Sequence, residues 1–449
     1  MRIKLLPATP PSHVAVAAAR TCYFPDGIVT PEATANWPRK DDLLQSVFNA
    51  GHHTTLQHTH VTLLIEGMSR HLIWRLLHSH SFYNSEQVSQ RYARMRRENV
   101  YIPETGDKAP WEAFYQEIFG EYEILIALLV PKIEALLPKF LKKQAVKKAQ
   151  EFARYILPVG LTAYLYHTVN VITLLRYIAA APALPEAATE GRLFASLLEK
   201  ALLELDPSLA PLIEEAKASP ASFPKIAIDT ITSAHQIKPG EDVRIFDVVG
   251  GLETGTPENY ASVLRPSQLF FDTSILGGFS SYLKLSLSAD AQNQRHRRSP
   301  AIRPALESIY APAFYTPALL EGEALQRYET IIAKSYRFFE TQRDKIGFGE
   351  AVYALPNAHL IQIVERNDFA SFHHKAQMRL CYNAQEEIFH LTYRQVEQLR
   401  QQQVRGSEQL LPPCTLRQQQ GIYPICPEGP RFCGIKVWKL PFDQYRRII

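Results

Sequence analysis

The spacing of apolar residues divides the chain into long helix-rich tracts and a few short strands. Residues 41–80 carry helical spacing, and the segment 112–180 keeps apolar residues three or four positions apart, so both are predicted to be mostly helical. In the second half, the runs VRIFDVV and LFFDTS are typical of short strands. The run FSSYLKLSLS alternates as a half-buried strand does, although a helix also fits it. A further helix-rich tract follows, from EALQRYETII to RQVEQL.

A Pro- and Ser-rich stretch, SPASFPKIAIDT, has the composition of a connection between domains. It predicts one domain at 1–220 and a second at 221–449. FARYILPVGL in the first half and AVYALPNAHL in the second each lie between two helical segments, so Leu157-Pro158 and Leu355-Pro356 are predicted to be equivalent. A repeat of about two hundred residues indicates duplication and fusion rather than a solenoid of short units.

Charge and hydropathy narrow the classes of protein. The 449 residues are 46% apolar and carry a formal net charge of +4, whereas a dedicated nucleic-acid binder usually has a stronger, clustered excess. A nucleic-acid-binding protein that uses RYARMRR and RHRRSP as phosphate contacts stays open as an alternative, with a steep salt dependence expected. The sequence shows no apolar run of membrane-spanning length and no secretory signal, so a cytoplasmic location and no membrane partner are expected.

The cysteines gather near the end of the chain. Of the five, Cys22 lies in the first half, while Cys381 and three tail cysteines lie in the last seventy residues. In a reducing compartment such clustering favours a metal over a disulfide, although the spacing lacks the paired C-x-x-C of a zinc site. Free thiols that pack as small apolar residues are the alternative. The candidate metal ligands are Cys414, Cys426 and Cys433.

Several motifs place histidines, hydroxyls and arginines where an anionic ligand would need them. GHHTTLQH at 51–58 is followed by IEGMSR and then by SEQVSQRY, in which Ser89 and Arg91 have the chemistry to hold a phosphate. The run RHRR at 295–298 fits an anion clamp, a nucleic-acid contact or a solvated loop. Taken singly, each of these motifs is equally compatible with a purely structural role.

The order and spacing of these motifs resemble the flavin-dependent thymidylate synthases. Members of that family carry Gly-His-x-Ser/Thr-x-x-Glu-His, then an Arg-His-Arg triplet, then Ser-x-Arg-Tyr. In the second half, RHR at 295–297, ALPNAHL, QMRLCYNAQEEI at 377–388 and CPEGPRFCG are similar to other family elements. The resemblance implies an α/β (α+β, helix-rich) fold in two tandem, thymidylate synthase-like copies.

Neither half carries a complete set of family motifs. His78-Ser79-His80 stands where the first half should have Arg-His-Arg, and Gln57 stands where the family has Glu. The second half has the triplet but no GHxT before it and no Ser-x-Arg-Tyr after it. Composite sites formed between the halves are therefore expected. The alternatives are a catalytically degenerate member that only binds flavin or nucleotide, and an enzyme for a different pyrimidine.

The chemistry that the resemblance implies is reductive methylation of deoxyuridylate (dUMP) at carbon 5. FAD is the implied cofactor, methylenetetrahydrofolate and NADPH are co-substrates, and no covalent protein nucleophile is required. A homodimer that mimics the family's homotetramer is expected. By motif position, the expected catalytic residues are Arg379 and Ser89. The expected flavin contacts are His52, Thr54, His58, His78, Arg295, His296 and Arg297, and the expected nucleotide contacts are Arg75, Glu86, Gln87, Ser89, Arg91 and Arg379.

Overall fold

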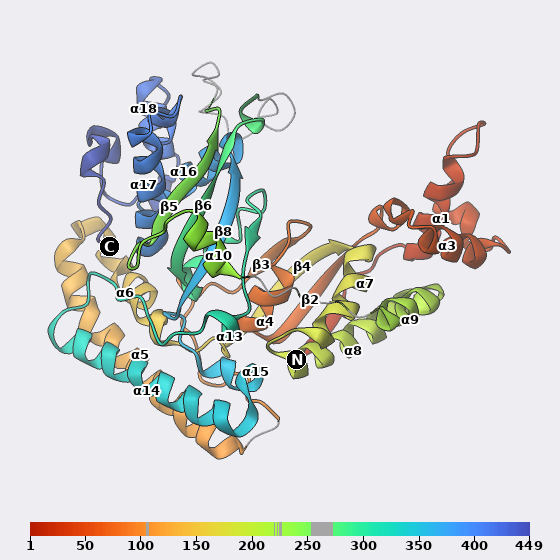
Figure 1. Ribbon diagram of the computed structural model, residues 1–449, viewed down its shortest axis with the longest axis horizontal. Coiled ribbons are helices and arrows are strands. Elements are labelled where there is room, and N and C mark those ends of the chain that lie inside the picture. The colour runs from red at the N-terminus through yellow and green to blue at the C-terminus, as the bar shows by residue number, and fades with distance from the viewer. Residues whose placement is uncertain (105–106, 220, 222, 224–226, 253–272) are drawn as a thin grey trace.

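A computed structural model describes residues 1–104, 107–219, 221, 223, 227–252 and 273–449. It contains two four-stranded antiparallel sheets, each built from one half of the chain (Figure 1). The strand orders are β1-β2-β4-β3 and β5-β6-β8-β7, so the two sheets have the same topology. The strands are β1 (Arg2–Leu5), β2 (His60–Ser69), β3 (Asn84–Gln87), β4 (Thr162–Asn170), β5 (Val243–Val249), β6 (Gly278–Ser286), β7 (Ala301–Ile302) and β8 (Leu360–Asp368).

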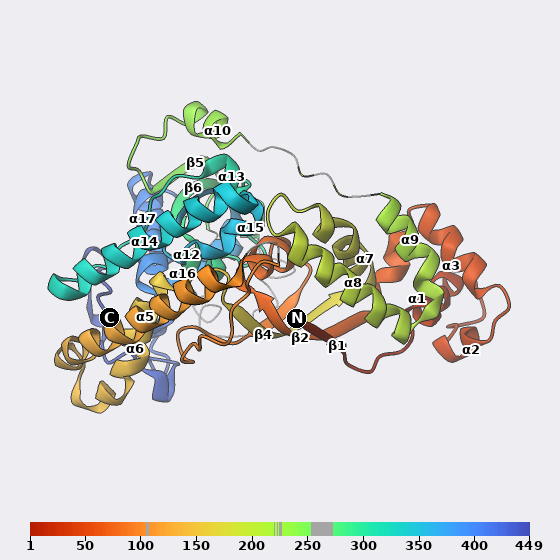
Figure 2. The same cartoon turned by 90° about the horizontal axis from the view of Figure 1, so that it is seen from below.

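Helices surround both sheets and join them. Two long helices, α5 (Lys108–Leu136) and α14 (Gly322–Ile346), come from different halves and run side by side (Figure 2). The helices of the first half are α1 (Pro11–Thr21), α2 (Pro31–Ala35), α3 (Lys40–Asn49), α4 (Arg70–Leu72), α6 (Ala145–Ala153), α7 (Val171–Ala180), α8 (Ala188–Leu205) and α9 (Ala210–Ala218). Those of the second half are α10 (Ile228–Ala234), α12 (Leu287–Asn293), α13 (Leu306–Ile309), α15 (Phe348–Ala351), α16 (Phe369–Arg379), α17 (Glu386–Gln401) and α18 (Pro413–Gln419).

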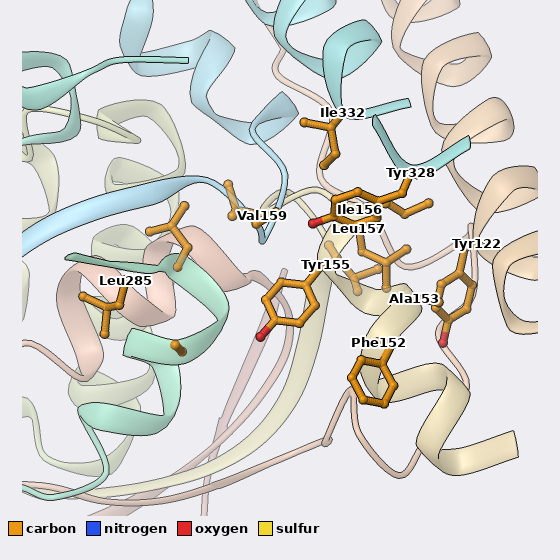
Figure 3. Packing of buried hydrophobic residues seen from close by; sticks show 14 of the residues in the cluster. Tyr122, Phe152, Ala153, Tyr155, Ile156, Leu157, Val159, Leu285, Tyr328 and Ile332 are labelled. Carbon is orange, nitrogen blue, oxygen red and sulfur yellow. The ribbon is translucent and has the colours of Figure 1, made fainter. Parts of the chain in front are cut away.

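The largest apolar core belongs to both halves at once. Phe114 on α5 stacks on Phe338 on α14 with ring centroids 4.2 Å apart. Near the same junction, Tyr155 and Leu157 from the first half lie close to Tyr328 from the second (Figure 3). Because apolar burial is the main favourable term in folding, neither half keeps its full stabilisation without the other.

The two Leu-Pro elements meet at this junction. Pro158 forms an antiparallel bridge with Pro356. The Val159 amide donates to the Leu355 carbonyl at 2.8 Å, and the Asn357 amide donates to the Leu157 carbonyl at the same distance. This exchange is reciprocal, as expected for two copies related by an approximate twofold axis. The predicted equivalence of Leu157-Pro158 and Leu355-Pro356 is confirmed.

A second reciprocal contact links the copies through buried carboxyls. Glu190 accepts hydrogen bonds from the Ser69 hydroxyl at 2.5 Å and from the Tyr353 hydroxyl, which comes from the other half, at 3.0 Å. Burial raises the pKa of Glu190 to about 7 and does the same for its counterpart Glu387. Each half thus completes a buried hydrogen-bond set of the other. The matching set consists of Glu387 and Ser286 from the second half and Tyr155 from the first.

The junction tolerates no side chain at Gly160. A Cβ there would lie 2.7 Å from the Tyr115 hydroxyl and 2.9 Å from both Cβ and the carbonyl oxygen of Tyr353. We expect Gly160→Ala to lower the free energy of unfolding by about 1–3 kcal/mol, because the two halves must separate to admit the methyl group. Denaturant unfolding measures this. Gly120→Ala, with nothing within 4 Å on α5, is the matched control and should be neutral or stabilising.

Several sequence-based expectations need correction. Residues 60–69, 162–170 and 360–368 lie in tracts predicted to be helical, but they are the central strands of the sheets. Their burial alternates, as in strands with one side facing the core. The strand predicted at FSSYLKLSLS and the one at VRIFDVV are confirmed. In LFFDTS, residues 269–272 lie outside the described residues and 273–275 form a 3₁₀ turn, and the proposed boundary at 220 also falls outside them.

No helix within the described residues is both long and apolar enough to cross a membrane.

Candidate functional site

A cavity of about 340 Å³ lies between the two halves. The first half contributes the start of α4, the π-helical turn at Ile73–Leu77 and the loop that follows β3. The second half contributes α12 and the last residue of α16. Five arginines line this arginine cavity. They are Arg70, Arg91 and Arg154 from the first half, and Arg295 and Arg379 from the second.

The charge of the arginine cavity is strongly positive. Burial, followed by the charges of Arg154 and Arg295, lowers the pKa of Arg70 to about 9. Burial, followed by the charges of Arg91 and Arg295, lowers the pKa of Arg379 to about 9. The positive charges of these guanidiniums therefore repel one another inside the cavity. An anionic ligand would relieve this repulsion and raise the pKa of both guanidiniums back toward its ordinary value.

The cavity also holds buried polar atoms without hydrogen-bond partners. They include Nε of Arg70 and Arg379, both Nε and Nη2 of Arg154, Oε1 of Gln87 and Nε2 of Gln90. Buried polar groups in folded proteins are nearly always satisfied, so such a concentration indicates that a polar ligand or ordered water completes the set. Because most of these atoms are donors, the expected ligand is rich in acceptor oxygens.

Arg91 is fixed by contacts to both halves. Its Nε donates to Glu151 at 2.5 Å, and its Nη2 donates to the Asn383 carbonyl at 2.5 Å. Its own amide donates to the Ser89 hydroxyl at 3.2 Å, which holds the loop in a tight turn. The Ser89 hydroxyl and the Arg91 guanidinium are thus presented together at the wall of the cavity, with little freedom left to lose on binding.

Arg379 is the last residue of α16 and is tied to the helix opposite. Its Nη2 donates to the Gln292 carbonyl on α12 at 2.6 Å, while its Nε has no partner. The guanidinium is therefore oriented by protein on one side and still has a free donor. This geometry suits recognition of a carbonyl edge or an oxyanion.

A second cavity of about 330 Å³, the side cavity, shares His78, Glu86 and Arg295 with the arginine cavity. Arg297 also lines it and donates to the Asn84 side chain at 2.7 Å. Burial and then neighbouring cationic groups hold the pKa of His78 well below its ordinary value, so this imidazole is neutral at pH 7. It stacks on Tyr83 at 4.6 Å.

The structure brings together most of the residues singled out from the sequence. Arg297 joins Arg295, His78 and Glu86 at the side cavity. Those that line the arginine cavity are His78, Glu86, Gln87, Ser89, Arg91, Arg295 and Arg379.

Arg75 does not belong to this group. It pairs with Glu186 at 3.4 Å and donates to the carbonyls of Arg303 and Pro304, away from the arginine cavity. His296 is also elsewhere, since it lines a third cavity beside the tail. For Arg75, a neighbour that is distant in sequence, Glu186, sets the direction of the side chain.

The motif GHHTTLQH is also separated from the cavities within one chain. Its residues form or flank a 3₁₀ turn, His53–Gln57, that contacts α1 at the outer end of the molecule. His52, Thr54 and His58 are exposed and line neither the arginine cavity nor the side cavity. The predicted meeting of His52 with Arg295 and Arg297 does not occur inside a single chain.

Two cavity arginines were missed by sequence reasoning. Arg70 ends the motif IEGMSR, and Arg154 lies in FARYILP, where Phe152, Tyr155 and Ile156 are all buried. A cation inside an otherwise apolar stretch is costly to bury, and this was the available signal.

The structure also shows which positions of the two halves correspond. The amides of Arg70 and His71 donate to the carbonyls of Leu161 and Val159, and those of Leu287 and Ser288 make the matching bonds to His359 and Asn357. Arg70 therefore corresponds to Leu287. Counting forward, His78-Ser79-His80 corresponds to Arg295-His296-Arg297, as the sequence comparison of the halves suggested.

The position related to the arginine cavity by the approximate twofold axis is filled by protein. Arg75 pairs with Glu186, and Arg303 pairs with Asp290 at 2.7 Å. Trp74 donates to the same Asp290 carboxylate at 2.7 Å. The charges of Arg75 and Arg303 are therefore neutralised internally on this side.

The cysteines are all free, and the described residues contain no group of three or more His, Cys, Asp and Glu side chains arranged around a single metal ion. The prediction that Cys414, Cys426 and Cys433 hold one ion is therefore not supported.

The fold and the site define a helix-rich α+β protein of two homologous halves with an anion-binding cavity between them. The chain matches the family described as thymidylate synthase complementing protein over residues 4–208 and 278–403, which is more than half of its length. The chain belongs to this family.

Known relatives carry a related description. A flavin-dependent thymidylate synthase of Clostridium tetani is 30% identical over 186 residues, covering 39% of this chain and 72% of the relative. A flavin-dependent thymidylate synthase of Nitratidesulfovibrio vulgaris is 27% identical over 192 residues, with the same coverage. A crystal structure of a flavin-dependent thymidylate synthase from Helicobacter pylori, complexed with FAD and dUMP, is 19% identical, with a TM-score of 0.35 and coverage of 48% of this chain and 99% of that chain.

Proposed function

We propose that the protein methylates dUMP at carbon 5 in the arginine cavity, with FAD as cofactor and methylenetetrahydrofolate and NADPH as co-substrates. The observation that carries this proposal is the convergence of Ser89, Arg91, Arg295 and Arg379 from two halves on one cationic cavity. Membership of the family supports the reaction type, and the names of the relatives support the flavin.

Different residues of the arginine cavity fit different parts of the nucleotide. Ser89 and Arg91 present a hydroxyl and a guanidinium that fit the nucleotide phosphate. Arg379, with its unpartnered Nε, fits the pyrimidine carbonyl where negative charge develops as carbon 5 reacts.

The side cavity fits the phosphates of the flavin. Arg295 and Arg297 supply two guanidiniums there, and neutral His78 adds a buried Nε2 without a partner. When bound, FAD supplies the hydride for the reaction. The protein's own part is to fix the pyrophosphate, keep the nucleotide beside the flavin and exclude water from the reacting face.

A homodimer would complete the flavin site. The exposed His52, Thr54 and His58 lie outside both cavities of their own chain, so they can reach a flavin only in a neighbouring copy. The two domains proposed at 1–220 and 221–449 would then act like two subunits of the family's homotetramer.

The visible absorption spectrum of the purified protein, with and without dUMP, tests the proposal. A flavin spectrum that dUMP perturbs, followed by formation of dTMP with methylenetetrahydrofolate and NADPH, is the expected result. A protein that takes up no FAD rules the proposal out. Uptake of FAD and dUMP without dTMP formation would instead establish the degenerate, binding-only alternative, which the closed second position favours.

We expect one dUMP to bind per chain rather than two. At the twofold-related position Arg75 pairs with Glu186 and Arg303 pairs with Asp290, so these two guanidiniums are already neutralised by carboxylates. Isothermal titration calorimetry measures the stoichiometry. Two equivalent sites per chain would contradict the assignment.

A further inference from the structure

Four of the five cysteines meet in one place. Cys381 follows α16, Cys414 lies on α18, and Cys426 and Cys433 flank a 3₁₀ turn in the tail. All four line a third cavity of about 240 Å³, which we call the cysteine cavity. They span more than fifty positions of sequence, so the tail must fold back on the end of α16 to bring them together.

Neighbouring thiols add to the effect of burial on the pKa of Cys414 and of Cys381. Burial, followed by the charges of the other three thiols, raises the pKa of Cys414 to about 12. Burial likewise raises the pKa of Cys381 to about 11, with contributions from Cys433 and Cys426. All four thiols line the same cavity, yet among the described residues they do not form a group that surrounds a single ion.

Without a bound metal the sulfurs of the cysteine cavity are neutral thiols. Burial raises the pKa of all four, and the Cys433 thiol donates to the Ile435 carbonyl at 3.6 Å. A metal ligand set here therefore has to release these protons on binding.

The walls of the cysteine cavity are otherwise largely apolar. Met378, Tyr382, Phe432, Ile435 and Val437 surround the thiols. Four cysteines that line one cavity, do not surround a single ion and are bordered largely by apolar side chains form the environment that iron–sulfur clusters occupy. In such a cluster each thiolate binds a different iron atom, and the inorganic core lies between the sulfurs.

We propose that Cys381, Cys414, Cys426 and Cys433 ligate a [4Fe–4S] cluster in the cysteine cavity. Ligation removes one proton from each thiol and forms one sulfur–iron bond per cysteine, with no change in oxidation state. The cluster would lie next to the nucleotide site, because Arg91 and Arg379 line both the cysteine cavity and the arginine cavity. The proposal is independent of the reaction assigned above.

Anaerobic reconstitution of the full chain with a mixture of ferrous and ferric iron and with sulfide tests the cluster, because both iron states that the mixed-valence core contains are then supplied. We expect about four iron and four acid-labile sulfide per chain. The double variant Cys426→Ser/Cys433→Ser should lose most of this iron, whereas Cys22→Ser, at the exposed cysteine of the first half, should keep it. Equal iron in the wild type and the double variant would overturn the proposal, as would one zinc per chain with no iron uptake.

A second measurement needs only the wild-type protein and so does not depend on the variants folding. After reconstitution, iodoacetamide should alkylate Cys22 and leave the four cavity cysteines unmodified, and removal of the iron by a chelator should expose them. Alkylation of the cavity cysteines at the same rate with and without iron and sulfide would overturn the proposal.

Discussion

Arg379→Ala is expected to weaken dUMP binding about 10- to 100-fold, the range for losing a charged hydrogen-bonding group. The Arg379 guanidinium is held by the Gln292 carbonyl at one nitrogen and has a buried Nε left for a ligand. Its removal deletes one of the five arginines that line the cavity, together with a hydrogen-bond donor held in a fixed orientation. Calorimetry or equilibrium dialysis with dUMP measures the loss.

Two variants separate this role from a general effect of charge. Arg298→Ala removes a cation that pairs with Asp368 and lines none of the cavities described here, so its dUMP affinity should stay within about twofold of the wild type. Arg379→Lys keeps the charge but loses the fork and should be intermediate. If Arg298→Ala and Arg379→Ala weakened binding equally, the specific role of Arg379 would be refuted.

Lys375→Ala is expected to lower the free energy of unfolding by about 3–5 kcal/mol, the range for breaking a buried ion pair. Lys375 lies 2.5 Å from Glu365, and both side chains are fully buried in the second half. Glu365 also accepts hydrogen bonds from the side chains of Asn293 and Asn367. Removing the lysine leaves an uncompensated carboxylate, and urea unfolding followed by circular dichroism measures the cost.

The pH dependence of the free energy of unfolding should also depend on the ion pair between Glu365 and Lys375. Burial alone would raise the pKa of Glu365, but Lys375 and the hydrogen-bonding side chains lower it to about 2. A carboxyl whose pKa is lowered in the folded state stabilises the fold above its ordinary pKa near 4.5, and this stabilisation is lost as pH falls toward 2.

The double variant Glu365→Gln/Lys375→Met is the control for the ion pair. It removes both charges, so it should recover much of the stability that Lys375→Ala loses and flatten the acid dependence. A double variant no more stable than Lys375→Ala would show that the pair is not the source of the effect.

The sequence predicted the plan of the molecule better than its local structure. The two Leu-Pro elements revealed the duplication because each sits at a structural junction between a helix and a strand. The strands β2, β4 and β8 were hidden because alternating burial over nine or ten residues also leaves apolar residues at helical spacing.

The site was only partly visible in the sequence. Motif order placed Ser89, Arg91, Arg295 and Arg379 together, and all four line one cavity. Arg75 was predicted to contact the nucleotide, but it lines none of the cavities described, because Glu186, more than one hundred residues away, sets its direction. The same holds for the closed second position, whose ion pairs depend on how the two halves dock. Such long-range pairings leave no periodic signal in a single sequence.

The core shared by α5 and α14 has a consequence for synthesis on the ribosome. The first half emerges with the apolar face of α5 uncovered, and the helix that covers it is complete only at Ile346. For more than two hundred residues of translation, the nascent chain must carry this face exposed or shielded by a chaperone. In separate subunits, the time needed to cover this face would depend on the concentration of the partner subunit. In the fused chain, it depends instead on the speed at which the ribosome elongates the chain.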